Sequence, residues 1–150
     1  MKILVYGYGN PGRQDDALGF LFSEEIKKLA EKENITGIET DTNFQLNAED
    51  SLLLKDKDAV VFVDASKEDV EDISFREIRP AGKIEFSTHF MRPESVLAFA
   101  AETFNAHPRS YMLAIKGYEW EFNMPLTEKA RRNLDEALEF LMKKITENKL

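Results

Sequence analysis

Three side chains able to do chemistry lie at or near the ends of apolar segments in this sequence. Asp16 lies in "VYGYGNPGRQDDALGF", Asp64 ends the apolar run of "AVVFVDAS", and His89 lies in "EFSTHFMRP". Carboxylate oxygens and an imidazole nitrogen together suit a borderline divalent metal such as nickel, zinc or manganese. Each residue alone also fits an ordinary loop or cap role, as we expect for His107 in "NAHPRS". The residue types therefore indicate a cation near the strand ends without fixing which one.

The first of these segments also carries the glycine spacing G-x-G-x-x-G in residues 7–12. In a dinucleotide-binding fold, such glycines bring backbone N–H groups and a helix start against a pyrophosphate. Here Pro11 lacks an N–H, and Asp15 and Asp16 bring two negative charges to the first turn of the expected helix. The charges argue against a bound dinucleotide.

The two adjacent aspartates need not have the same role. Asp is a favoured N-cap residue, so we expect Asp15 to cap the helix that follows. Consecutive helical residues point about 100° apart, so Asp16 can then face the crevice. This leaves Asp16 as the acid available for chemistry.

The composition limits the kinds of partner and compartment. The chain has 150 residues, which fits one domain spanning 1–150, and its formal net charge of −8 disfavours a nucleic-acid partner. No apolar run approaches the roughly 20 residues of a membrane span. The absence of cysteine excludes disulfides and thiolate metal sites, and the N-terminus reads as a strand, not a signal peptide. We expect a cytoplasmic protein without membrane contact.

The apolar patterns predict alternating strands and helices. Strands are expected at residues 2–6, 35–40, 59–66, 73–79 and 110–117. Helices are expected after the glycine turn, at 47–54, from Pro93 and from Thr127. This alternation predicts an α/β fold, with a mostly parallel sheet covered by helices on both faces. Ligands of such sheets bind at the carboxyl ends of the strands, which is where Asp16 and Asp64 fall.

The motifs, taken together, resemble the hydrogenase maturation proteases, endopeptidases that trim the C-terminus of [NiFe] hydrogenase large subunits. That family opens with a strand, G-x-G-N, an acidic pair and a glycine. It continues with a buried strand ending in D-A, here "VFVDAS", and a histidine before an amphipathic helix, here "FSTHFMRPESVLAFA". The residues of this sequence that match the opening block are Gly7, Gly9, Asn10, Asp15, Asp16 and Gly19.

The resemblance implies a three-layer αβα sandwich around a five-stranded sheet. It also implies that Asp16, Asp64 and His89 are the catalytic and metal-contacting side chains. The metal is nickel, supplied by the immature large subunit that is the partner and substrate, and zinc or cadmium could occupy the same site. The residues that we expect to contact the substrate are Asn10, Phe44, Gln45, Tyr118 and Trp120.

Two departures from the family pattern leave the particular hydrogenase open. The second strand is followed by "TDTNFQLNAED" in place of a D-G-G-T turn, and Ala17 stands where glycine is common. Two mechanisms also stay open, because the metal could polarise the scissile carbonyl or a bound water, or a carboxylate could act as general base on water.

Two other functions fit parts of the sequence. The "GYGNPG" opening is similar to peptidyl-tRNA hydrolase, but "RQDDALG" follows where that family has a catalytic histidine, and the net charge of −8 opposes RNA binding. A non-catalytic, chaperone-like binder of the immature subunit is the other alternative. The apolar side chains that we expect at the crevice rim, or as a small core under the loops, are Phe44, Leu46, Tyr118, Trp120 and Phe122.

Overall fold

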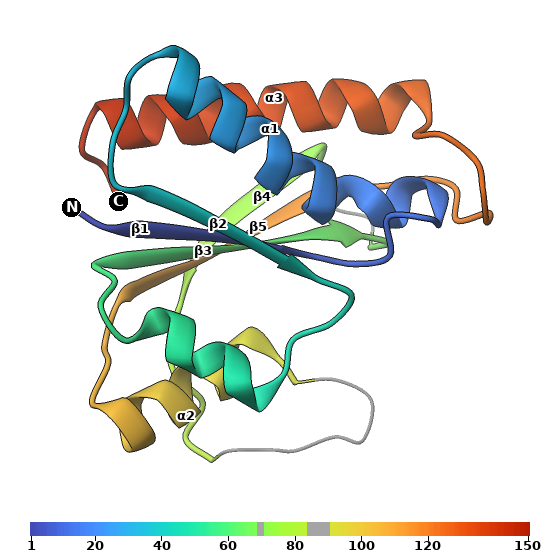
Figure 1. Cartoon of the computed structure of the whole chain (residues 1–150). Coiled ribbons are helices and arrows are strands. Elements are labelled where there is room, and N and C mark those ends of the chain that lie inside the picture. Colours follow the sequence, from blue (N-terminus) through green and yellow to red (C-terminus); the bar gives the residue numbers. More distant parts are fainter. Residues whose placement is uncertain (69–70, 84–90) are drawn as a thin grey trace.

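A five-stranded sheet forms the middle of the molecule in the computed structural model, which describes residues 1–68, 71–83 and 91–150 (Figure 1). The strand order is β2-β1-β3-β5-β4, and only β4 runs antiparallel to its neighbour. This confirms the predicted mostly parallel sheet. The strands are β1 (Ile3–Tyr8), β2 (Ile38–Asn43), β3 (Ala59–Ser66), β4 (Ile73–Ile78) and β5 (Arg109–Lys116).

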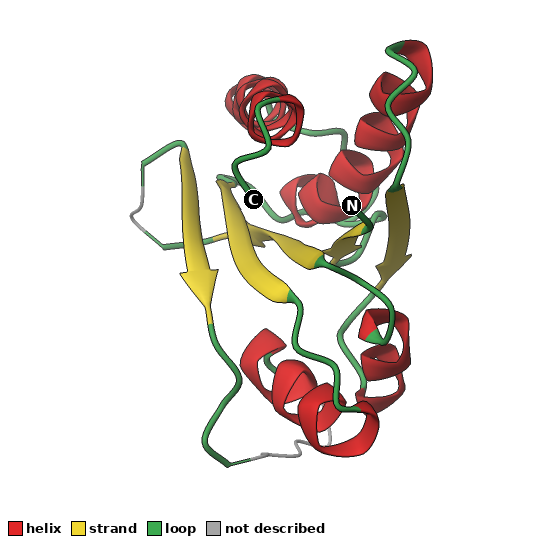
Figure 2. Cartoon of the chain, turned by 90° about the vertical axis from the view of Figure 1, so that its left-hand side faces the viewer, coloured by secondary structure: helices red, strands yellow, loops and turns green. Residues whose placement is uncertain are grey.

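Helices cover both faces of the sheet, so the predicted αβα sandwich is also confirmed (Figure 2). One face carries α1 (Leu18–Lys32) and α3 (Glu128–Thr146). The other carries α2 (Pro93–Phe104) and the 3₁₀ helix η2 (Ala48–Leu54). A further 3₁₀ helix, η1 (Gln14–Ala17), leads into α1. No helix of the described residues is long and apolar enough to cross a membrane.

The central strand β3 packs against both helical layers. Val61 and Val63 belong to the core under α1 and α3, while Val60 and Phe62 belong to the core above α2 and η2. Side chains of a strand alternate between its two faces, so a strand covered on both sides is apolar at consecutive positions. This explains the unbroken apolar run that ends at Asp64.

Two strands differ from their predicted bounds by two residues or more, whereas the others match within one residue. β1 continues to Tyr8, two residues beyond the expected end, and β2 spans Ile38–Asn43 instead of residues 35–40. Gly37 has a φ of +86° and its carbonyl oxygen accepts the N–H of Ile3 at 2.8 Å, so pairing with β1 begins only there. Positive φ is a conformation that favours glycine, and apolar alternation alone does not locate it.

The glycine spacing has a packing role in this fold. A Cβ on Gly19 would lie 2.5 Å from the carbonyl oxygens of both Tyr8 and Val63, so α1 starts directly against the ends of β1 and β3. Gly9 has a φ of +132° and turns the chain out of β1. Within the spacing itself, a Cβ on Gly7 would clash with the carbonyl oxygen of Gly19, so Gly7 also allows the close approach of helix and sheet. Gly7 and Gly9 therefore have backbone roles in this fold that need no dinucleotide.

Candidate active site

Asp16 and Asp64 lie at the carboxyl edge of the sheet. Asp16 is in η1, directly after the turn that leaves β1, and Asp64 is near the end of the neighbouring strand β3. The two carboxylates are close enough for the negative charge of Asp16 to raise the pKa of Asp64. The structure therefore brings together two of the three side chains that the sequence predicted for the site.

Asp16 is held by the turn that precedes it. Its Oδ2 accepts the backbone N–H of Asn10 at 2.9 Å, and its own N–H donates to the carbonyl of Arg13 at 2.9 Å. The turn is further closed by the side chain of Asn10, whose Oδ1 accepts the N–H of Gly12 at 2.9 Å. The Asp16 side chain is half-buried, so one face of the carboxylate is anchored while part of it reaches solvent.

Asp64 is a strongly perturbed carboxyl. Burial raises its pKa from 3.8 to about 7; the backbone N–H of Ala65, which donates to Oδ1 at 2.8 Å, opposes the rise, and the charge of Asp16 adds to it. A carboxyl with a pKa near 7 exchanges a proton readily at neutral pH, which is what a general acid or base requires. Such perturbed acids concentrate at functional sites.

Tyr8 is a neighbour of this site that sequence reasoning missed. Burial and then the charge of Asp64 raise the pKa of its phenol, so the hydroxyl stays protonated, and it donates to Sδ of Met112 at 3.8 Å. The sequence indicated Tyr8 only through the alternation of β1. Leu4, Tyr6 and Tyr8 are at alternate positions, and all three belong to the core above α2 and η2.

The expected helix-capping role of Asp15 is wrong. Asp15 is fully buried in η1, and neither η1 nor α1 has a side-chain cap. Its carboxylate instead accepts four hydrogen bonds from the segment that joins β5 to α3. The donors are the N–H of Tyr118 at 2.8 Å, of Glu119 at 3.1 Å and of Thr127 at 2.9 Å, and the Thr127 hydroxyl at 2.9 Å.

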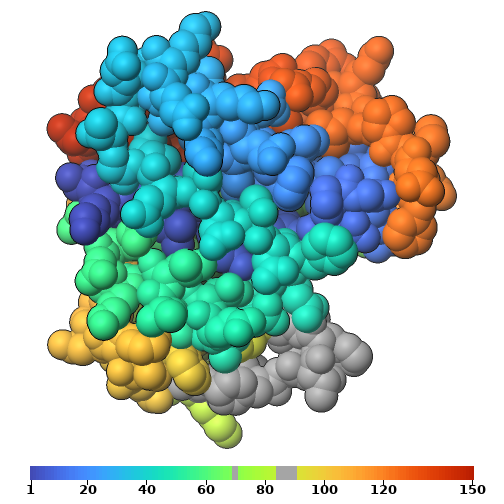
Figure 3. Space-filling view, in the orientation of Figure 1, coloured from blue at the N-terminus to red at the C-terminus, as the bar shows by residue number. Residues whose placement is uncertain are grey.

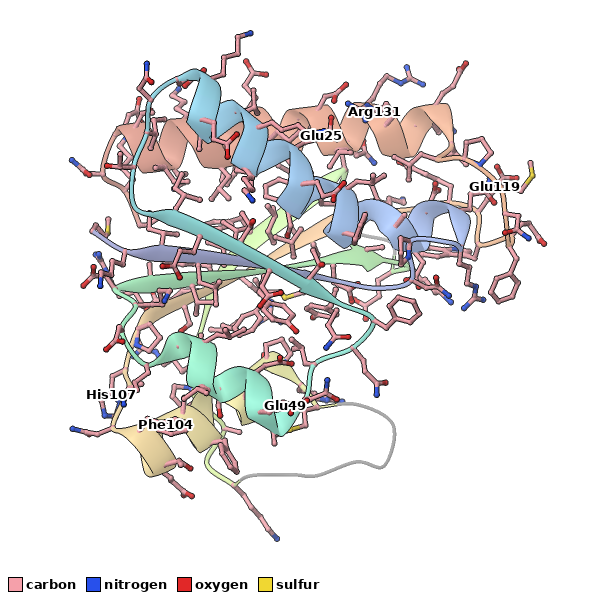
Figure 4. All side chains as sticks on the ribbon, viewed as in Figure 1. Glu25, Glu49, Phe104, His107, Glu119 and Arg131 are labelled. Carbon is pink, nitrogen blue, oxygen red and sulfur yellow. The ribbon has the colours of Figure 1, made fainter. Side chains whose placement is uncertain are left out.

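Further contacts tie the same two segments together. Nε of Arg13 donates to the carbonyl of Trp120 at 3.0 Å, and the N–H of Glu121 donates to Oε1 of Gln14 at 3.0 Å. In Figure 3 the segment between β5 and α3, in orange, lies against the blue surface of the N-terminal turn. Figure 4 shows Glu119 at the far end of the molecule from the N-terminus, on this segment. The turn that carries Asp16 is thus braced by residues about a hundred positions later in the chain.

The third predicted side chain, His89, lies outside the described residues. Within those residues, no group of three His, Cys, Asp or Glu side chains is arranged to hold a metal. The two carboxylates nevertheless fit a divalent cation, because a buried carboxyl beside a second negative charge is relieved of that repulsion when a cation binds. Asp16 and Asp64 are the side chains that would supply oxygen donors to such an ion.

The residues predicted to contact substrate have different surroundings. Phe44 is 65% exposed and Gln45 is also exposed, both in the connection that follows β2. Asn10 shapes the turn at Asp16, as described above. The Tyr118 ring packs against the core of α1 and α3, and Trp120 is half-buried with Nζ of Lys67 4.8 Å from its ring centre.

Two other residues of these loops, Leu46 and Phe122, differ clearly in exposure. Leu46, expected at the crevice rim or in a small core, is 1% exposed and belongs to the core of α2 and η2. Phe122, on the segment between β5 and α3, is 67% exposed with the guanidinium of Arg13 over its ring. The expected helix-end role of His107 also fits, since its Nε2 lies 2.9 Å from Oδ1 of Asn105, the C-cap of α2.

The chain shares its fold with [NiFe] hydrogenase maturation proteases. The protease HycI from Thermococcus kodakarensis KOD1 superposes with a TM-score of 0.71 at 22% identity, covering 95% of this chain and 90% of HycI. The maturating endopeptidase HybD from E. coli superposes with a TM-score of 0.71 at 17% identity, covering 99% and 94%. An endopeptidase from Escherichia coli gives 0.73 at 20% identity, covering 99% and 94%.

No protein-family model matches the sequence, and neither does any curated protein. The similarity of this chain to known proteins is therefore a similarity of structure.

Proposed function

We propose that this protein is an endopeptidase that removes the C-terminal extension of the nickel-loaded large-subunit precursor of a [NiFe] hydrogenase, in the cytoplasm. The observation that carries the proposal is the pair Asp16 and Asp64, electrostatically coupled at the carboxyl edge of the sheet. The support from structure is that the fold is shared with proteins named hydrogenase maturation proteases.

Asp64 is proposed as the group that moves the proton. With a pKa near 7, its carboxylate can take a proton from an attacking water, and the acid form can return it to the amine that leaves. Asp16, fixed by the N–H of Asn10, keeps negative charge beside Asp64 and orients the water or the substrate.

Nickel enters this proposal as part of the substrate. Asp16 and Asp64 would contact the nickel of the immature large subunit, with His89 as the proposed third contact. A metal at this position could also act as a Lewis acid on the scissile carbonyl. Recognition of the loaded metal would restrict cleavage to precursors that are ready for it.

The test is cleavage of purified nickel-loaded precursor, followed by mass spectrometry of the released extension. We expect the wild type to cut, and Asp16→Asn, Asp64→Asn and His89→Ala to lose at least about a hundredfold in rate, the usual scale for an acid–base group. Matched controls are Asp56→Asn and His107→Ala, which change exposed residues of the same types outside the site. Controls as slow as the site variants would overturn the assignment of these residues.

A non-catalytic binder is the second candidate, and the exposure of Phe44 and Phe122 favours it. Such aromatic side chains often anchor a protein partner. This candidate predicts that the nickel-loaded precursor is bound in a pull-down and stays intact. The same mixture therefore separates the two functions.

A further inference from the structure

A groove lies beside the candidate active site, between η1 with the start of α1 and the residues that lead into α3. We call it the η1–α3 groove. Its volume is about 850 Å³. Its lining is mostly apolar and includes Pro11, Ala17, Phe20, Leu21, Met124 and Leu126.

The groove is continuous with the element that carries Asp16. Gln14 and Ala17, the first and last residues of η1, line the groove. Asp15 is buried between them and holds the opposite wall through Thr127. Asp16 belongs to the same four-residue helix, so a segment lying in the groove contacts the element that positions the candidate catalytic carboxylate.

The charge in the groove differs from that of the chain as a whole. The protein has a net charge of −8, yet Arg131 and Arg132 both line this groove, against a single carboxylate, Glu128. Arg131 is paired with two carboxylates, with Glu25 at 2.7 Å, a pair that joins α3 to α1 (Figure 4), and with Asp135 at 3.1 Å. Arg132 has no ion pair within the described residues and is exposed. The groove thus offers an apolar floor beside a guanidinium, which complements an apolar segment with an acidic neighbour.

We propose that the η1–α3 groove docks an apolar, acid-flanked segment of the precursor at a distance from the scissile bond. This inference rests on the proposed function, because it names the part of that substrate that the protein holds. Apolar side chains of the segment fill the floor between Phe20 and Met124, and a carboxylate pairs with Arg132. Docking here adds affinity for the folded precursor without touching the reacting groups.

The test compares Met124→Asp and Arg132→Glu with two matched controls. Met124 is 53% exposed, so the substitution places a charge in the groove without opening the core, and Leu52→Asp does the same at a residue 58% exposed on η2. Arg109→Glu matches Arg132→Glu at an exposed arginine on β5. We expect the two groove variants to raise KM for the nickel-loaded precursor about tenfold each with kcat within about twofold, and the controls to resemble the wild type. Unfolding midpoints by circular dichroism check that all variants fold.

A binding measurement separates this inference from the proposed function. In an Asp16→Asn background, Met124→Asp and Arg132→Glu should weaken binding of the same precursor by about the same factor. If the wild type leaves the precursor intact but binding still depends on the groove, the docking site stands and the proposed protease function fails. If cleavage occurs and KM does not change in the groove variants, the docking site is wrong.

Two further outcomes also overturn the docking site. One is that the precursor does not bind at all. The other is that ultracentrifugation shows a dimer of this chain that Met124→Asp dissociates, because the groove then holds a second copy.

Discussion

Two aspartates near the same edge of the sheet, Asp15 and Asp64, have opposite surroundings. Asp15 receives four hydrogen bonds from Tyr118, Glu119 and Thr127. Asp64, at the end of β3, receives one within the described residues, from the N–H next to it, and its pKa is raised to about 7. Asp15 is fully buried and Asp64 is half-buried, and the fully buried acid is the one with more hydrogen-bond donors.

The comparison shows how a fold divides roles between acids of the same type. Hydrogen bonds to a carboxylate favour its charged form, whereas burial with few donors favours the neutral form. Asp15 is therefore suited to hold two segments together, and Asp64 is suited to exchange a proton. Asp16, between them in the sequence, joins both regions through η1.

Replacing Asp15, the acid that accepts four hydrogen bonds, should have the largest effect on stability. Asp15→Ala leaves three backbone N–H groups and a hydroxyl without their acceptor, so we expect a loss of about 3–5 kcal/mol in unfolding free energy. Urea denaturation measures it, with Asp56→Ala as a control at an exposed aspartate. A loss below about 1 kcal/mol would mean that the Asp15 bonds are replaced by water.

Replacing Asp64, the acid with a single hydrogen bond within the described residues, should stabilise the protein, and only at higher pH. Because the pKa of Asp64 is raised from 3.8 to about 7, its protonated form contributes stability that is complete below about pH 4 and lost as pH rises through 7. Asp64→Asn avoids that loss, so we expect a gain of roughly 2–4 kcal/mol over wild type at pH 8 and almost none at pH 4. Urea denaturation at both pH values tests this, and an equal effect at both would contradict a raised pKa.

A smaller effect is expected for a donor to Asp15. Oγ1 of Thr127 donates to Asp15 at 2.9 Å and accepts the N–H of Ala130 at 3.2 Å as the N-cap of α3. Thr127→Val keeps the shape and removes both bonds, which should cost about 1–2 kcal/mol. Thr36→Val, at an exposed position, is the control for thermal unfolding. Equal midpoints for the two variants would show that the hydroxyl contributes little to this clamp.

The smallest expected effect is on the pKa of Asp64, through its electrostatic coupling to Asp16. Asp16→Asn removes the charge that raises the pKa of Asp64, so that pKa should fall toward the ordinary range, while burial keeps it elevated. An NMR titration of the Asp64 carboxyl carbon measures the change, with Asp56→Asn as the control. An unchanged pKa would place the two carboxylates outside electrostatic contact.

The layers of the fold could be predicted from the sequence because the strands are buried on both sides. The run from Ala59 to Val63 and the helix pattern after Leu18 gave correct elements and a correct fold class. Positions that depend on backbone geometry were harder, such as the start of β2, which follows the positive φ of Gly37. Apolar spacing carries no information about that angle.

The candidate site was partly predictable for a similar reason. Asp16 follows β1 and Asp64 lies near the end of β3, and these parallel strands are neighbours in the sheet, so the two strand-end positions predicted that the side chains would meet. The role of Asp15 could not be seen, because its partners lie more than a hundred residues away in the sequence. Tyr8 was missed because an aromatic residue at a strand end also fits plain packing. The prediction for His89 stays open.

The clamp on Asp15 also has a consequence for the order of events during synthesis. Thr127 follows Asp15 by 112 residues, so a nascent chain contains Asp16 and Asp64 well before it contains the donors that fix η1. The turn that carries Asp16 can therefore reach the arrangement described above only after the start of α3 has been made.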